Sequence, residues 1–294
     1  MHNDTHLNVL FSFAYLAGAK RTIDRVIDLC KQGTINLMID SGAFTAYNAR
    51  GKYDHINVDS YCEFLEVFKN YCDKYVMLDV IRNAKASKAN YEKMLAKGLN
   101  PMFVATMYDK DFEYMRKAVG NNPDICVAGG SATKGDWMTN RFIKIYNETG
   151  QRARIHGLAY VTFPKMFQLP IKSVDSASWK LAAKKFGSLC FFTENGLKNI
   201  NYNDVLKGRK KLKPFQISEL HRLGVTPQDF VERNFRGNNS ISALLSVNAN
   251  IQLQKYCKRR NLDFFLSASN LQDINQIVYV ATAEKLSYKE FREI

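Results

Sequence analysis

The chain has 294 residues, of which 46% are hydrophobic and 24% charged, and its formal net charge is +14. This composition excludes a disordered or fibrous protein and supplies enough apolar residues for one large core or two smaller ones. No apolar run approaches the roughly 20 residues that span a bilayer, and no secretory leader is visible at the start. We therefore expect a soluble protein of the cytoplasm that does not bind a membrane.

Strand-like and helix-like segments alternate along the first part of the chain. The predicted strands cover residues 8–16, 36–40, 75–79, 101–106, 124–128, 154–158, 171–175 and 188–192. The predicted helices between them cover residues 21–31, 58–71, 87–97, 110–119, 136–148, 164–167 and 177–185, with Ser87 as a helix cap. This alternation is typical of parallel β/α units.

Eight such units make a (β/α)8 barrel of the TIM type, and a doubly wound open sheet is the alternative. After about residue 195 the alternation stops, and helices are predicted near 216–223, 227–234, 240–260 and from 271 to the end, with a break near Leu286. We therefore predict a catalytic barrel core over residues 1–195. Residues 196–294 are predicted to form a helical region that packs on the barrel or completes it.

The positive charge favours a polyanionic partner such as nucleic acid, although a solubilising surface explains charge alone equally well. Each of two basic clusters alone fits a solvated face, but together they can follow a phosphate backbone. The first cluster lies in a loop-like run and the second ends a predicted helix. Their members are Lys207, Arg209, Lys210, Lys211 and Lys213, and then Lys255, Lys258, Arg259 and Arg260.

Six cysteines stand at positions 30, 62, 72, 126, 190 and 257, with no C-x-x-C pair and no histidine at metal-ligand spacing. This pattern indicates reduced, mostly buried thiols. We expect no structural zinc, no other metal and no cofactor.

Acids or glycines end five of the predicted strands. They are Asp40, Asp79, Gly129 with Gly130, Gly157 and Asp175. In a barrel the carboxyl ends of all strands meet at one mouth, where catalytic residues collect, and an open sheet brings these five ends together less readily. Each aspartate alone also fits a helix cap or a turn. Three carboxylates at one mouth shift each other's pKa values, which functional sites tolerate more often than scaffolds do.

Two carboxylates that flank a reacting centre suit glycosidic chemistry. One can attack the anomeric carbon while the other manages the proton on the leaving or entering group. A third carboxylate can accept hydrogen bonds from amide-like N–H groups, and an aromatic ring such as Phe44 can stack on a flat base.

Five motifs in chain order resemble those of the tRNA-guanine transglycosylases, or queuine tRNA-ribosyltransferases. The likeness is closer to their small phage-type relatives, which insert 7-deazaguanines into DNA. The motifs are DSGAF at 40–44, LDVI at 78–81, GG at 129–130, HGLAY at 156–160 and SVDSASW at 173–179. They resemble the family's DSGGF or DSGGY motif, its base-reading strand end, its glycine pair, its GGLA loop and the signature around its nucleophile.

The resemblance implies that Asp175 is the nucleophile that attacks C1′ and expels guanine, which leaves a covalent nucleotide–enzyme intermediate. Asp40 would be the general acid/base, Asp79 would read the N1 and exocyclic amine edge, and Phe44 would stack on the base. The remaining substrate-binding positions would be Ser41, Gly42, Gly129, Gly130, His156, Gly157 and Leu158. The partners would be DNA, whose target nucleotide leaves its stack, and a free preQ0-like 7-deazaguanine base.

The chain departs from the tRNA enzymes in several respects. It has no cysteine-rich zinc element and no separate RNA-binding module, which favours DNA over tRNA. Ala43 and His156 each stand where the family has a glycine. His156 can contact the substrate, or it can make an ordinary backbone hydrogen bond at a strand end.

Three other functions stay open at this point. They are the same exchange on tRNA, a catalytically silent nucleic-acid-binding paralogue or accessory subunit, and a glycosylase that releases the base to water. A phage-encoded enzyme would act in the host cytoplasm. No motif sets the oligomeric state.

Overall fold

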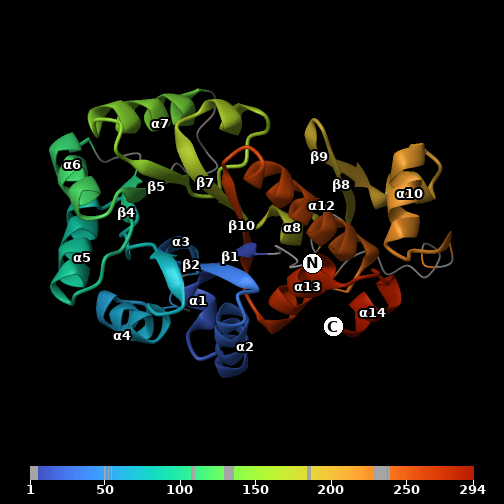
Figure 1. The fold of residues 1–294 in the computed structure, drawn as a ribbon, viewed down its shortest axis with the longest axis horizontal. Coiled ribbons are helices and arrows are strands. Elements are labelled where there is room, and N and C mark those ends of the chain that lie inside the picture. The colour runs from blue at the N-terminus through green and yellow to red at the C-terminus, as the bar shows by residue number, and fades with distance from the viewer. Residues whose placement is uncertain are drawn as a thin grey trace. The chain divides into compact units, whose positions relative to one another are not determined.

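The computed structural model describes residues 6–49, 51, 53, 55–106, 110–128, 136–183, 187–227, 229, 237 and 239–294. The chain divides into two compact units (Figure 1). The sheet unit comprises Asn8–Ser176 and Arg260–Asn270, and the second unit comprises Met1–Leu7, Ala177–Arg259 and Leu271–Ile294.

The sheet unit is an α/β structure built on an eight-stranded, curled parallel sheet. Its strands are β1 (Leu7–Ser12), β2 (Ile35–Asp40), β3 (Cys72–Tyr75), β4 (Phe103–Thr106), β5 (Asp124–Ala128), β6 (Arg154–Gly157), β7 (Ile171–Ser176) and β10 (Asp263–Ala268). They are ordered β3-β2-β1-β10-β7-β6-β5-β4. Strands β1 and β5 are almost entirely buried, as in parallel sheets that are covered on both faces.

Helices connect successive strands and lie along the outer side of the curled sheet (Figure 1). They are α1 (Phe13–Leu16), α2 (Lys20–Lys31), α3 (Ala43–Asn48), α4 (Val58–Phe68), α5 (Ala84–Ala96), α6 (Phe112–Asn121), α7 (Trp137–Glu148) and the 3-10 helix η1 (Lys165–Gln168). In α4 the side chains of Tyr61, Leu65 and Phe68 are buried along one stripe, which is the amphipathic pattern expected of a helix on a sheet. The predicted alternation of strands and helices is confirmed in this unit.

The two outermost strands of this order, β3 and β4, are also hydrogen-bonded where they meet. Val76 and Met102 form a parallel bridge just beyond the ends of the two strands. The Met102 N–H donates to the carbonyl of Tyr75 at 2.8 Å, and the Met77 N–H donates to the carbonyl of Met102 at 3.0 Å.

The prediction of an eighth sheet strand at 188–192 is wrong. That segment is β8 (Ser188–Thr193), which pairs antiparallel with β9 (Gly196–Asn201) in a separate two-stranded sheet of the second unit. The place between β1 and β7 belongs to β10, which lies between the helices predicted at 240–260 and from 271 onward, where no strand was predicted. Residues 177–195 consequently belong to the second unit and residues 260–270 to the sheet unit, a division that differs from the predicted boundary near residue 195.

The second unit is organised around one long buried helix, α12 (Ile241–Lys258). Nearly every described side chain on its first four turns is buried, as in a helix that packs on all sides. It packs against β8 and α13. The other helices among the residues that the structure describes in this unit are α8 (Ser178–Leu181), α9 (Tyr202–Leu206), α10 (Pro214–Arg222), α13 (Leu271–Thr282) and α14 (Tyr288–Glu293). Most of the helix predicted at 227–234 lies outside the described residues.

All six cysteines are free thiols, and all but Cys30 are buried, as the sequence predicts. None of the helices in the described part of the chain combines the length and the apolar character needed to cross a membrane.

Candidate active site

The carboxylate of Asp175, near the end of β7, is held by three groups from the ends of its two neighbouring strands, β6 and β10. Its Oδ1 accepts a hydrogen bond from the Ala159 N–H at 2.7 Å and lies 3.3 Å from Nε2 of His156. Its Oδ2 accepts from the Ser267 hydroxyl of β10 at 3.2 Å. The residue is only 8% exposed, so these contacts orient the carboxylate in place of water.

His156 of β6 lies between Asp175 and Ser173 and is fully buried. Its Nδ1 is 2.8 Å from the Ser173 hydroxyl. A carboxylate can only accept, so the Nε2 atom must carry the proton that faces Asp175; in a neutral ring Nδ1 then accepts from Ser173. The histidine therefore contacts two side chains of β7, in place of the substrate or backbone contact considered from the sequence.

Ala159 adopts a strained backbone conformation next to this carboxylate. Its φ is +53°, in the left-handed region that costs a residue with a side chain about 1–2 kcal/mol. The same conformation directs its N–H at Asp175 Oδ1. Strain of this kind persists where the surrounding structure demands it, which is frequently at a functional site.

Asp40 ends β2, and its Oδ2 accepts a hydrogen bond from the Gly42 N–H at 3.0 Å. The side chain keeps partial access to solvent but is surrounded by protein. Burial raises the pKa of Asp40 to about 6; the negative charge of Asp175 adds to this rise, and the Gly42 N–H opposes it. Asp40 is thus a carboxyl group that can gain and lose a proton near neutral pH.

Gly42 is required by packing within the protein. Its φ is +79°, and a Cβ built there would lie 2.6 Å from Cβ of Ala14 and 2.7 Å from Oγ of Ser12. The backbone after Asp40 therefore lies directly against the junction of β1 and α1. The resemblance implied that Gly42 is a substrate-binding position, whereas the close approach that the structure shows is to the protein's own chain.

Asp79 lies in the loop after β3, between two residues anchored by α5. The Ser87 hydroxyl accepts from the Val80 N–H at 2.8 Å, and the Asn90 amide donates to the Leu78 carbonyl at 3.0 Å. The prediction that Ser87 caps this helix is wrong, because the Asn83 side chain caps it by accepting from the Ala86 N–H at 3.0 Å.

Burial raises the pKa of Asp79 to about 7, and the charge of Asp40 contributes to the rise. Cys126 of β5 is affected by all three carboxylates. Burial raises the pKa of its thiol, and so, in decreasing order, do the charges of Asp40, Asp175 and Asp79. The charges of all three aspartates therefore reach Cys126, with Asp40 and Asp175 near the carboxyl ends of β2 and β7 and Asp79 in the loop after β3.

Phe44 and Tyr47 lie one turn apart on α3, just after Asp40. Their side chains are 66% and 51% exposed, so an aromatic face is available close to the carboxylates. Ser41 is fully buried, and its hydroxyl has no hydrogen-bond partner among the described residues.

The loop after β6 is more constrained. A Cβ at Gly157 would lie 3.1 Å from Cβ of Tyr160, and the Leu158 N–H already donates to the Val127 carbonyl at 3.2 Å. The predicted positions Gly129 and Gly130 lie outside the described residues.

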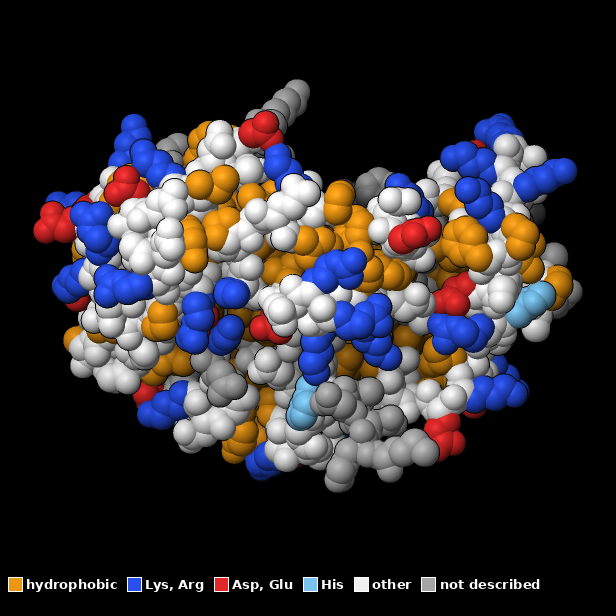
Figure 2. Space-filling model, turned by 45° about the horizontal axis from the view of Figure 1, so that its top comes forward, with side chains coloured by type: hydrophobic (Ala, Val, Ile, Leu, Met, Phe, Trp, Pro, Cys, Tyr) orange, Lys and Arg blue, Asp and Glu red, His pale blue; other side chains and the backbone are white. Residues whose placement is uncertain are grey.

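The basic residues predicted to bind nucleic acid are all exposed. In the first cluster, Arg209 lies 3.9 Å from Asp204. The ammonium groups of Lys207, Lys210, Lys211 and Lys213 have no carboxylate partner within the described ranges. In the second cluster, Arg259 lies over the ring of Tyr256 and Arg260 over that of Phe167. Lys and Arg side chains are spread over the face drawn in Figure 2.

No model of a known protein family matches the chain, and no curated protein matches it. Within the residues that the structure describes, no group of three or more His, Cys, Asp and Glu side chains could hold a metal ion.

The sequence analysis did not predict Ser267, because its strand was not predicted, and it did not predict the contacts of His156 with Ser173 and Asp175. The alternating residues Ser173 and Asp175, which share one face of a strand, were the available signal.

Proposed function

We propose that this protein is a guanine transglycosylase that exchanges guanine in nucleic acid, DNA rather than tRNA, for a preQ0-like 7-deazaguanine base. One observation carries the proposal. Asp40 and Asp175 lie close enough for the charge of Asp175 to raise the pKa of Asp40, yet their surroundings differ. Asp175 is oriented by three donors, whereas Asp40 is a proton-exchanging group near neutral pH.

We further propose that the curled sheet is a closed (β/α)8 barrel. The bridge between Val76 and Met102, which links the outermost strands β3 and β4, supports closure. So does the strand order, in which each strand of the sheet unit lies beside its sequence neighbour and β10 joins β7 to β1. A closed barrel places the ends of β2, β3 and β7 around one mouth, where such enzymes carry their active sites.

The surroundings of Asp175 suit a nucleophile. Its Oδ1 is engaged by Ala159 and His156, while Oδ2 accepts from Ser267 and from no other residue that the structure describes, so it keeps a lone pair. In the proposed first step Oδ2 bonds to C1′ of the target nucleotide, the C1′–N9 bond breaks, and its electron pair leaves with guanine. In the second step the entering base attacks C1′ and releases the carboxylate.

Asp40 is suited to the proton transfers that these two steps need. A carboxyl group with a pKa of about 6 is protonated often enough to give a proton to the departing base. The carboxylate left behind can then take a proton from the entering base.

Asp79 and Phe44 support the choice of a purine-like base. An ionised Asp79 accepts hydrogen bonds from an N–H and an amino group, and such donors favour its charged form against the burial that opposes it. The exposed ring of Phe44 offers a stacking surface. The target nucleotide must leave its stack to reach these residues.

Trapping of the covalent intermediate tests this proposal. The protein is incubated separately with guanine-containing DNA and with tRNA, denatured, and examined for a mass or gel shift. We expect a shifted species with DNA that disappears when a free 7-deazaguanine is added as acceptor. Asp175→Asn should abolish it, while Asp136→Asn, at a side chain that is 74% exposed, should not.

A shift with tRNA alone would replace DNA by tRNA as the substrate. If water hydrolyses the covalent species when no acceptor base is added, the protein would be a base-releasing glycosylase. No shift with either nucleic acid would contradict the proposed chemistry.

A further inference from the structure

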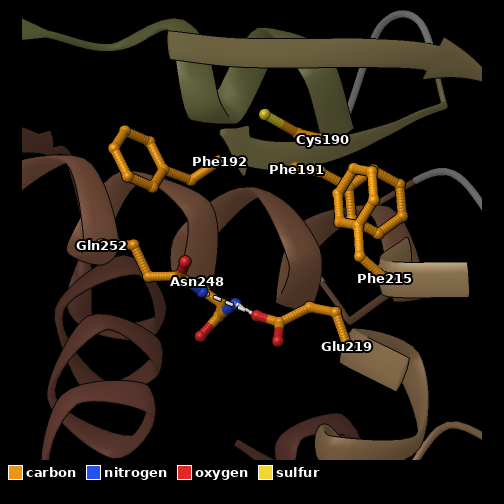
Figure 3. A pocket seen from close by; sticks show the side chains of 7 residues that line it. All are labelled: Cys190, Phe191, Phe192, Phe215, Glu219, Asn248 and Gln252. Atoms are coloured by element: carbon orange, nitrogen blue, oxygen red, sulfur yellow. Dashed lines mark hydrogen bonds between the residues drawn. The ribbon is translucent and has the colours of Figure 1, made fainter. Parts of the chain in front are cut away.

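The second unit contains a pocket of about 210 Å³ between β8, α10 and α12 (Figure 3). Three phenylalanine rings form its apolar wall: Phe191 and Phe192 from β8, and Phe215 from α10. The rings of Phe191 and Phe215 lie nearly edge-on, with their centroids 6.3 Å apart. Phe191 is buried, but Phe215 is 46% exposed, so one ring is open to a ligand at the rim.

The opposite wall carries a fixed polar network around Glu219 of α10. Its Oε1 accepts from Nδ2 of Asn248 and Nε2 of Gln252, both at 2.6 Å (Figure 3). Arg222 donates to both carboxylate oxygens at 2.8 Å and to Asn248 Oδ1 at 2.9 Å. The hydrogen bond from Arg222 and those from the amides lower the pKa of Glu219, so its charge is compensated within the protein.

Gln252 is the member of this network that has capacity left for a ligand. Its hydrogen bond to Glu219 uses one N–H. Its second N–H and its carbonyl oxygen make no hydrogen bond to other described residues, and the side chain is partly exposed. The pocket therefore presents an amide edge, one donor beside one acceptor, close to exposed aromatic surface. A nucleobase has the complementary features, because every base has a flat face and an edge with donors or acceptors.

Positive charge lies directly beside this pocket in the sequence and in the fold. Lys213 is the N-cap of α10, two residues before Phe215, and ends the first basic cluster. The cluster is exposed over Lys207–Lys213 apart from the half-buried Leu212, and its lysines have no carboxylate partner in the described chain. A strand whose base enters the pocket would place its phosphates near these cations.

We propose that this pocket binds one unpaired nucleobase of a single-stranded segment of nucleic acid, with the neighbouring phosphates on the Lys207–Lys213 cluster. The inference rests on the proposed function only in that the protein acts on nucleic acid. It requires neither Asp175 nor base exchange. The aromatic rings and the Gln252 amide favour a flat base with a hydrogen-bonding edge over an acidic peptide, whose carboxylates would find no cation among the residues that line the pocket.

Fluorescence anisotropy with two labelled probes tests the inference. One is an oligothymidylate of about 12 nucleotides, and the other is an abasic strand of the same length and charge. The unmodified protein should bind the base-bearing strand more tightly. Phe215→Ala should weaken that binding about 5- to 150-fold, the effect of removing one stacking ring, and leave the abasic strand unaffected.

Ile217→Ala provides the matched control, because Ile217 is 43% exposed on the same helix but does not line the pocket. It should leave both affinities unchanged. Gln252→Leu, which keeps the volume but removes the amide edge, should also reduce the preference for the base-bearing strand. Thermal unfolding of each variant confirms that it is folded.

Two results would overturn the inference: unchanged binding of the base-bearing strand by Phe215→Ala, or an equal loss on both strands. Neither result affects the covalent trap at Asp175, so the pocket and the proposed chemistry can fail separately.

Discussion

Nε2 of His156 lies 3.3 Å from Oδ1 of Asp175, across the boundary between β6 and β7. The histidine is fully buried and its other nitrogen is 2.8 Å from Ser173. A ring that is fixed at both nitrogens can hold the carboxylate in one orientation, which is the role of a positioning residue. The proposed chemistry needs such control, because one oxygen must face C1′ while the other is occupied.

Replacement of His156 by phenylalanine should slow base exchange without abolishing it. The change keeps the ring but removes a hydrogen bond to a charged group, so kcat should fall about 10- to 150-fold with little effect on KM. Single-turnover exchange on DNA measures this. Ser173→Ala keeps the histidine–aspartate contact and should have a smaller effect. A rise in KM alone would contradict a positioning role.

Asp40→Asn should stabilise the protein at about pH 8 but not at about pH 4. The folded-state pKa of about 6 lies above the ordinary value of 3.8. Between pH 3.8 and about pH 6, Asp40 is ionised in the unfolded chain but still protonated in the folded protein. Its carboxyl group therefore lowers the free energy of unfolding above about pH 6. Asparagine removes this cost and can still accept from Gly42; we expect a gain on the order of 1–2 kcal/mol in urea unfolding at the higher pH. An equal gain at both pH values would rule out the ionisation as its cause.

Activity should depend on the same proton. We expect the rate of base exchange to change with an apparent pKa near 6, because Asp40 must be protonated in one step and ionised in the other. A pH profile of single-turnover rates checks this. Asp40→Asn should remove that limb of the profile together with most of the rate. Persistence of the limb in the variant would assign it to another group.

Gly42→Ala should destabilise the sheet unit strongly. It forces a side chain into the left-handed region and places Cβ 2.6 Å from Ala14. Gly18→Ala is the matched control, since Gly18 has φ +77° but nothing lies within 4 Å of the place that its Cβ would take. We expect about 1–2 kcal/mol from the backbone conformation in both variants and about 1–3 kcal/mol more at Gly42 from overpacking. Urea unfolding measures the difference, and similar losses at the two positions would show that the close contact relaxes.

Reversal of Lys210 and Lys211 to glutamate should weaken DNA binding and flatten its salt dependence. Both side chains are exposed, and loss of two phosphate contacts should reduce the slope of log K against log salt by about 2. The same reversal at the exposed residues Lys85 and Lys289 changes the net charge equally and should have little effect. Equal effects of the two pairs would indicate a general charge effect in place of a binding surface.

Local patterns in the sequence were enough to predict most strands and helices and the residues at their ends. The apolar run before Asp40 and the alternation of strands with helices are local patterns, so β2, β5 and β7 were predicted within a residue or two. Asp40, Asp79 and Asp175 could be placed at one end of a sheet for the same reason. The basic clusters could also be identified, because runs of Lys and Arg are visible in the sequence itself.

The strand that completes the sheet could not be predicted from local patterns. The segments at β8 and β10 are both short apolar runs, and pairing with β1 and β7 depends on contacts more than 80 residues apart along the chain, which no local pattern encodes. The donors around Asp175 come from the ends of two other strands, β6 and β10, and the constraint on Gly42 comes from Ala14 and Ser12. The pKa values of Asp40 and Asp79 follow from burial and from each other's charge. These properties depend on contacts between residues that are far apart in the sequence, and such contacts form only when the chain folds.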